Sequence, residues 1–231
     1  MNSENYNPGA PVIELNEQSR GRFIARTYGH LAGAVMAFVA IEVVLFKTGL
    51  AESLASALTG VSWLLVLGGF MLIGWLARYA ASHTESLVGQ YLALSAYVLA
   101  EAIIFVPLLY MANKLAPGTI TSAALISALG FGSLTLLVFS TRKDFSFMRG
   151  ILMWGGIVAL VLIAGGVIFG FHLGTFFSVA MIALAGASIL YDTSNVLHHY
   201  SEDRYVGAAL ELFASVALLF WYVLRLLSSR D

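Results

Sequence analysis

The chain has 231 residues, of which 59% are hydrophobic and 11% charged, and its mean hydropathy is +0.86. A soluble domain is about half apolar and about a quarter charged. One core of this size cannot bury so many apolar residues, so lipid must solvate much of this chain. The formal net charge is −1 and the basic residues are scattered, so the chain lacks the basic patch of a nucleic-acid-binding protein. It has no cysteine, which excludes disulfides and thiolate metal sites.

The N-terminal segment, residues 1–22, is polar. A cleavable secretory signal has a basic stretch followed by an apolar one, and this segment does not show that pattern. We expect residues 1–22 to form a flexible polar tail on the cytoplasmic side, ahead of a single transmembrane domain at 23–231.

Seven apolar stretches follow, and each approaches the roughly 20 residues that a helix needs to cross a bilayer core about 30 Å thick. They predict an all-α integral membrane protein, a seven-transmembrane-helix bundle, and the segments between them are too short to hold another domain. The predicted spans are Ile24–Phe46, Val61–Arg78, Leu87–Ala112, Ile120–Phe139, Ile151–Phe171, Phe176–Leu197 and Val206–Leu227.

Lysine and arginine predict the orientation, because cytoplasmic loops carry an excess of both. With the N-terminus in the cytoplasm, that side holds Arg20, Arg22, Arg26, Arg78, Arg142, Lys143, Arg149 and Arg204, against Lys47, Lys114, Arg225 and Arg230 on the other. We therefore predict a cytoplasmic N-terminus and a C-terminus on the opposite side.

The most informative residue is Asp192, an acid inside the otherwise apolar run Ser178–His199. A charged carboxylate near the bilayer centre costs about 2.5–3.5 kcal/mol on insertion scales, so it needs a partner, a water path or a proton. In the predicted orientation, Arg78 and Glu211 lie at a similar depth, in the cytoplasmic third of the bilayer. These three residues are therefore candidates for one intramembrane site.

Helical spacing indicates which way the acids face. Small and polar residues follow each acid in steps of three or four: Ala185, Ser188 and Asn195 with Asp192, and Gly207, Ser215 and Tyr222 with Glu211. Both acids should therefore face the bundle interior. Two neighbouring carboxylates in a low dielectric cannot both ionise cheaply, whereas a guanidinium favours the charged form. The sequence thus predicts a proton-sensing or gating cluster of Asp192, Glu211 and Arg78.

Simpler interpretations remain open for each member of this cluster. Arg78 can extend to the interface while its stem stays in lipid. Glu211 can be hydrated by headgroups, and Asp192 can serve only as a structural hydrogen-bonding group.

Other polar residues suggest an ion path or a solvated surface. Glu101, one turn after Tyr97, is expected to line the same cavity further out, together with Ser188 and Asn195. Glu42, near the end of the first span, is expected to be interfacial. His198 and His199 are expected to be solvated rather than to hold a metal, and no confident metal site or cofactor is predicted.

Several enzyme motifs are missing. The sequence has no HExxH, phosphate-binding loop, glycine-rich dinucleotide fingerprint or GxSxG elbow. We therefore predict that the protein is not an enzyme.

Two segments resemble signature segments of the Bax inhibitor-1 family: Thr141-Arg142-Lys143-Asp144-Phe145-Ser146, and Ile189-Leu190-Tyr191-Asp192-Thr193. The sequence is most similar to the bacterial YccA-like branch of this family, through Ser146-Phe147, Asp192–Val196 followed by His198, and the closing Ser229-Arg230-Asp231.

The resemblance implies a seven-helix membrane protein with one of two activities. Some members are pH-sensitive calcium leaks, in which an aspartate pair on the sixth and seventh helices shares protons and a second-helix arginine closes the path. Asp192 matches the first aspartate and Arg78 the arginine, but Ser215 stands where the second aspartate is expected. We hypothesise that Glu211, four residues earlier on the same face, partly replaces that acid.

YccA-like members instead bind and restrain a membrane-anchored ATP-dependent protease, so the resemblance also implies a regulatory protein. A proton-coupled carrier is a third possibility, although it requires an inverted repeat that the pattern does not offer. We expect a pH-sensitive calcium leak or a protease modulator in a bacterial inner membrane, with the lipid bilayer, calcium or protons, and such a protease as the expected partners.

Overall fold

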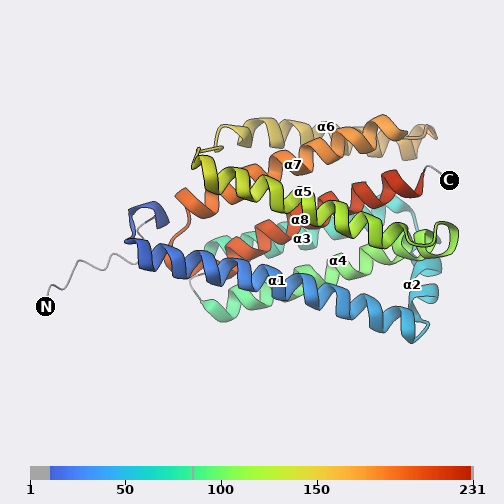
Figure 1. Ribbon diagram of the computed structural model, residues 1–231. Coiled ribbons are helices and arrows are strands. Elements are labelled where there is room, and N and C mark those ends of the chain that lie inside the picture. Colours follow the sequence, from blue (N-terminus) through green and yellow to red (C-terminus); the bar gives the residue numbers. More distant parts are fainter. Residues whose placement is uncertain (1–10, 85, 230–231) are drawn as a thin grey trace, which may run out of the picture.

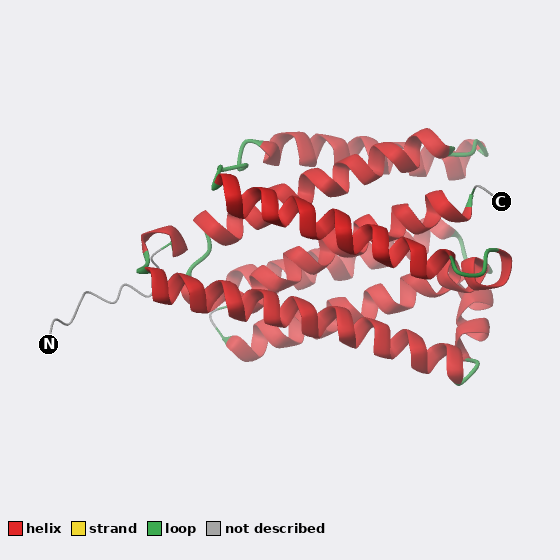
Figure 2. Ribbon diagram, in the orientation of Figure 1, coloured by secondary structure: helices red, strands yellow, loops and turns green. Residues whose placement is uncertain are grey.

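The computed structural model describes residues 11–84 and 86–229, and these residues form a bundle of α-helices (Figures 1 and 2). Apart from an isolated bridge between Pro11 and Ser201, the described residues contain no β-structure. The helices are α1 (Glu17–Lys47), α2 (Leu50–Thr59), α3 (Trp63–His83), α4 (Leu87–Leu115), α5 (Thr119–Thr141), α6 (Met148–Phe169), α7 (Thr175–His198) and α8 (Tyr205–Ser228), with 3₁₀ turns η1 (Val12–Glu14) and η2 (Glu202–Arg204).

Seven of these helices are long and apolar enough to cross a membrane, and each overlaps one predicted span. The predicted fold class, an all-α bundle with seven candidate transmembrane helices, is therefore confirmed. The cytoplasmic position of the N-terminus remains a prediction, because the fold alone does not orient the bundle in the bilayer.

Helix α2 was not predicted, since the segment between the first two spans was expected to be a connection. Its ten residues are too few to cross a bilayer. Gly49, with φ +77°, makes the left-handed turn that separates α2 from α1. Ala51 and Ala55, one turn apart, pack against Val106 of α4, so α2 covers one end of the bundle (Figure 1).

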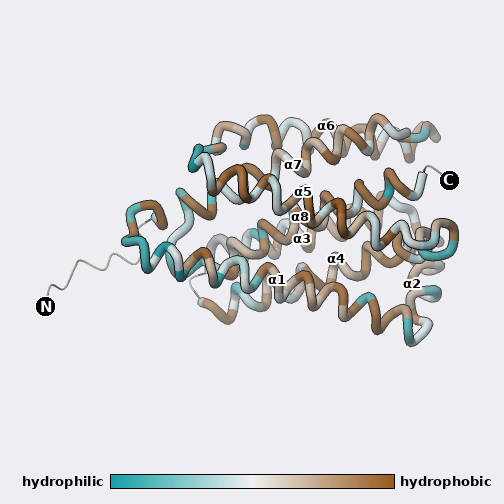
Figure 3. Tube along the Cα trace, in the orientation of Figure 1, coloured by the Kyte–Doolittle hydropathy of each residue, from teal (hydrophilic) through white to brown (hydrophobic). Residues whose placement is uncertain are grey.

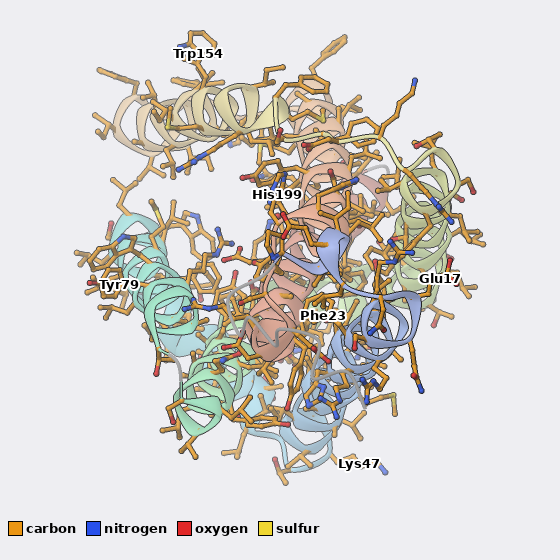
Figure 4. The ribbon with its side chains drawn as sticks, turned by 90° about the vertical axis from the view of Figure 1, so that its left-hand side faces the viewer. Glu17, Phe23, Lys47, Tyr79, Trp154 and His199 are labelled. Carbon is orange, nitrogen blue, oxygen red and sulfur yellow. The ribbon has the colours of Figure 1, made fainter. Side chains whose placement is uncertain are left out.

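Helix α8 occupies the centre of the bundle and contacts α1, α3, α4, α5 and α7 (Figure 1). Within the most apolar window of each helix, 72% of the residues in α8 are buried but only 6% in α6. Both helices are apolar along most of their length (Figure 3), so hydropathy alone does not predict which of them is buried. On α6, Trp154 is 71% exposed and points away from the bundle (Figure 4), as expected of a lipid-facing helix.

The chain before α1 packs against the connection between α7 and α8. Val12 is fully buried, and its backbone N–H donates to the carbonyl of Tyr200 at 2.8 Å. Asn16 caps α1 by accepting from the backbone N–H of Ser19 at 2.9 Å. Residues 11–22 of the predicted tail thus include η1 and the first turns of α1, while residues 1–10 lie outside the described residues.

Glu42, expected at the membrane interface, faces the interior of the bundle, and its depth in the bilayer remains a prediction. Glu42 is 7% exposed and continues the buried stripe of α1, one turn beyond Phe38. Phe38 packs against Phe105 of α4 and Phe213 of α8, with ring centroids 5.1 and 6.3 Å apart. Neither carboxyl oxygen of Glu42 has a hydrogen-bond partner in the structure. Glu42 belongs to the core-facing stripe of α1 because of helical periodicity. Its position near the end of the helix did not reveal this orientation.

Candidate functional site

A cavity of about 820 Å³ lies between α3, α4, α6, α7 and α8. Figure 4 views the bundle along its helices, with Tyr79 of α3 at the left and Trp154 of α6 at the top. The charged residues lining the cavity are Arg78, Glu101, Asp192, Glu211 and Arg225. The three residues of the predicted cluster therefore share one cavity.

Asp192 is held by a short polar chain between α7 and α8. The side chain is 8% exposed, and the Ser215 hydroxyl hydrogen-bonds Oδ2 of Asp192. The hydroxyls of Ser215 and Ser188 are 2.9 Å apart. The residue that replaces the expected second acid is therefore the direct partner of Asp192.

Glu211 is paired with arginine rather than with Asp192. Its Oε2 lies 3.4 Å from Nε of Arg78, and the guanidinium lies 5.9 Å from the ring centroid of Tyr97. The side chains of Arg78 and Glu211 are 49% and 28% exposed, and both line the cavity. Arg78 thus points toward the interior instead of extending to the interface, and the site consists of two neighbouring pairs, Asp192–Ser215 and Arg78–Glu211.

Three of the four predicted path residues also line the cavity. Tyr97 and Glu101, one turn apart on α4, are 3% and 5% exposed, and Ser188 lines the cavity from α7. Asn195 is not among the lining residues, and its backbone carbonyl accepts from the N–H of His199. Asn195 lies on the predicted stripe but close to the end of α7, where the chain leaves the cavity.

Tyr200, in the connection between α7 and α8, was not singled out in the sequence. Burial and the charges of Glu211 and Asp192 raise the pKa of its hydroxyl well above the ordinary tyrosine value. The hydroxyl of Tyr200 is therefore neutral. Its partly buried ring lies close to the acids, at the end of the bundle where α1 begins. Its position in a short polar connection gave no periodic signal by which the sequence could place it.

The first signature segment contacts the part of α7 that directly follows the second one, beside this site. The backbone N–H of Phe145 donates to Oγ of Ser194 at 2.8 Å, and Ser194 lies two residues after Asp192 on α7. Asp144 accepts from the N–H of Ser146 at 2.8 Å, and its Oδ2 lies 3.2 Å from Nε2 of His199. The Ser146 N–H, with a smaller contribution from His199, holds the pKa of Asp144 below its ordinary value. His199 is thus part of a contact between loops.

The described residues contain no group of three or more histidine, aspartate or glutamate side chains that could hold a metal ion. The cavity instead presents separate carboxyls on α4, α7 and α8. Its polar wall can hold and release protons and attract cations.

Comparison with known proteins places these features in a family. The family model described as "Inhibitor of apoptosis-promoting Bax1" matches residues 20–231. "Modulator of FtsH protease YccA" of Escherichia coli is 34% identical over 110 residues, which are 46% of this chain and 49% of that protein. A "BI1-like protein" of Arabidopsis thaliana is 29% identical over 231 residues, covering 96% of this chain and 86% of that protein. "Protein lifeguard 3" of Mus musculus is 29% identical over 154 residues, covering 56% of this chain and 48% of that protein.

The chain spans about half the length of the YccA proteins that it matches. These relatives are named as a protease modulator or as an inner membrane protein, and the names do not describe an enzyme. Together with the seven apolar helices, they identify a multi-pass integral protein of the bacterial inner membrane. Because the family model covers almost the whole chain, from residue 20 to residue 231, the protein belongs to the Bax inhibitor-1 family.

Proposed function

We propose that this protein is a cation leak controlled by protonation of the Asp192–Glu211–Arg78 cluster, with calcium as the expected ion. The cavity carries this proposal. Its lining on α8 extends from Glu211 to Arg225, and the 14 steps between these residues rise about 21 Å at about 1.5 Å per residue. That length is a large part of a hydrocarbon core about 30 Å thick.

The two polar pairs supply a means of control. With Asp192 and Glu211 charged and Arg78 protonated, the cluster carries one net negative charge, and a single proton neutralises it. A proton on Glu211 also weakens the attraction that holds Arg78 in its present position. In a low dielectric these changes act strongly on the neighbouring groups, so pH can alter the arrangement that closes this end of the cavity.

The remaining lining residues suit a hydrated cation. Glu101, Ser188 and Tyr97 offer oxygen atoms along the wall. Calcium takes six to eight oxygen ligands, and the separate carboxyls of this cavity can replace only a few of them. A calcium ion in transit would therefore keep much of its water, which favours weak binding and passage. We propose no catalytic step for any of these groups.

The test is calcium flux into liposomes that contain the purified protein, measured between pH 5 and pH 8. We expect Asp192→Asn and Glu211→Gln each to reduce the pH dependence severalfold. Glu42→Gln is the matched control, because it neutralises a buried acid that does not line the cavity. If both cluster variants match the parent protein, neither acid controls permeation.

A second candidate function is the modulation of a membrane-anchored ATP-dependent protease. It is supported by the relative named "Modulator of FtsH protease YccA". In the predicted orientation the connection 142–147 faces the cytoplasm, where it can meet such a protease. A modulator should co-purify with the FtsH protease and change the turnover of its substrates. It should do so while calcium flux in liposomes stays at background, which separates it from the leak.

A further inference from the structure

The cavity is larger than an ion path requires. Its volume of about 820 Å³ falls within the range of about 300–1,000 Å³ typical of small-molecule sites. A single water molecule, by comparison, occupies about 30 Å³ in the liquid. The cavity therefore has room for an organic molecule.

Aromatic side chains form much of the wall. Those that line the cavity on α3, α4 and α8 include Trp63, Phe70, Tyr97, Phe105, Trp221 and Tyr222. Trp63 and Trp221 are stacked with centroids 6.2 Å apart, and Phe105 meets Trp221 edge-on at 4.9 Å. Aromatic faces attract cations and pack well against apolar groups.

The charges are unevenly distributed among the lining residues. The guanidinium of Arg78 forms its ion pair with Glu211, whereas Glu101 hydrogen-bonds the hydroxyl of Tyr97 and receives only a smaller Coulombic attraction from Arg78. At the other end, Arg225 donates to the carbonyl of Leu173 at 3.2 Å. Glu101 is therefore an acid whose charge a cationic guest can offset, next to the aromatic wall.

The edges of the cavity are helices that face lipid. Only 17% of the most apolar window of α3 and 6% of that of α6 are buried. The wall on α6 is apolar, with Leu152, Met153, Leu160 and Ile163 among its lining residues. A guest dissolved in the bilayer therefore meets the side of the bundle where α3 and α6 border the cavity.

We propose that this cavity binds a lipophilic organic cation, with its positive charge beside Glu101 and its apolar groups against the aromatic rings and α6. A weakly hydrated organic cation gives up little solvation on entry, and ring faces together with a carboxylate compensate for that loss. This binding uses the same cavity as the proposed calcium leak, but it does not depend on any ion being conducted.

The test compares two probes of the same shape and opposite charge, tetraphenylphosphonium and tetraphenylborate. Binding is measured on the full chain in lipid nanodiscs, and empty nanodiscs correct for partition into lipid. We expect tetraphenylphosphonium to bind saturably and Glu101→Gln to weaken it about tenfold. Glu42→Gln, a buried acid outside the cavity, should leave the affinity unchanged. Equal binding of both ions, or an unchanged affinity in Glu101→Gln, would overturn the proposal.

A second measurement places the guest in the cavity even if Glu101→Gln does not fold. The chain has no cysteine, so single cysteines can be introduced on α6 and α5. A Cβ added at Gly156, which lines the cavity, or at Gly132, which does not, meets nothing within 4 Å. Tetraphenylphosphonium should slow maleimide labelling of Gly156→Cys severalfold and leave that of Gly132→Cys unchanged. Equal effects on both cysteines would place the guest in bulk lipid and contradict the proposal.

Discussion

Asp192 illustrates how a carboxyl is accommodated inside an apolar bundle. The cost of burying it is reduced by the Ser215 hydroxyl, which in turn meets Ser188. Glu211, one turn from Ser215 on α8, is compensated instead by Arg78. Each acid thus has a partner of its own, because a hydrogen bond or an opposite charge must offset the desolvation of a buried charged group.

Removing the Ser215 hydroxyl isolates the first of these pairs. We expect Ser215→Ala to destabilise the protein by about 1–2 kcal/mol, since a buried polar group loses its partner. The measurement is unfolding in detergent, followed by circular dichroism. Ser133→Ala is the control: its hydroxyl bonds only to the carbonyl of Leu129 on its own helix and is exposed. A loss no larger than that of the control would show that Ser215 does not stabilise Asp192.

Glu42 presents the opposite case, a buried carboxyl with no partner in the structure. Replacing an unsatisfied buried polar group with an apolar one removes its desolvation penalty, so Glu42→Leu should stabilise the protein by about 1–3 kcal/mol. Glu52→Leu is the comparison, because Glu52 is exposed and its contacts with Lys114 and Tyr110 lie on the surface. Its effect should stay within about 0.5 kcal/mol. Destabilisation by Glu42→Leu would indicate that the carboxyl has a partner after all.

At the scale of elements, the end of α5 and the start of α6 are fixed by their contact with α7. Arg142 ends α5 with φ +50°, a left-handed conformation that is uncommon for a residue with a side chain. The loop that follows is held by Asp144, through Ser146 and His199, and by Ser194 on α7. This conformation is maintained because the neighbouring hydrogen bonds compensate for its cost.

The contacts of Asp144 predict a dependence of stability on pH. Because its pKa is lower in the folded state, Asp144 contributes stability above the unfolded pKa of about 3.9, and this is lost as pH falls through the folded pKa. The side chain is 45% exposed, so solvent limits the effect to about 0.5 kcal/mol. Unfolding of Asp144→Asn should therefore show a smaller pH dependence between pH 5 and pH 2 than that of the parent.

The control for this prediction is Asp203→Asn, in the exposed turn η2. It should retain the acid-range pH dependence of the parent protein. Identical pH profiles for Asp144→Asn and the parent would mean that the loop contact does not involve a charged carboxylate.

At the scale of the whole molecule, the connection between α7 and α8 and the chain before α1 pack together near the acids of the cavity. Val12 and Pro11 pair with Tyr200 and Ser201, and Tyr200 lies close to Asp192 and Glu211. This arrangement joins the N-terminal segment to the proposed ion path. If the proposed leak is correct, Tyr200 or the segment that holds it must move for the path to open at this end.

Removing the aromatic ring of Tyr200 should lower the resistance of the proposed path to calcium. If the proposed leak is correct, Tyr200→Ala should raise calcium flux in liposomes severalfold, because the volume of the ring is lost beside the acids. Tyr200→Phe, which retains the ring, should stay near the parent value. Equal flux in the two variants would place the barrier elsewhere along the cavity.

The apolar stretches by themselves determined the class of fold. A run of about 20 apolar residues can satisfy its backbone in lipid only as a helix, so seven runs predicted seven spans without tertiary information. The same reasoning identified Asp192, since an acid in such a run needs compensation wherever the helix lies. Helical spacing also placed Ser188, Ser215 and Glu211 on inward faces, because periodicity is a local property.

Only the tertiary structure decided which helices are neighbours and which groups pair. Helices α6 and α8 are both strongly apolar, yet α8 became the centre and α6 an edge through packing between distant segments. The pairing of Arg78 with Glu211, and of Asp192 with Ser215, required α3, α7 and α8 to meet at one depth. The burial of Glu42 and the position of Tyr200 depend on the same contacts. In a bilayer, hydrophobicity drives a helix into lipid but does not select its partners, so side-chain shape and polar contacts decide the arrangement.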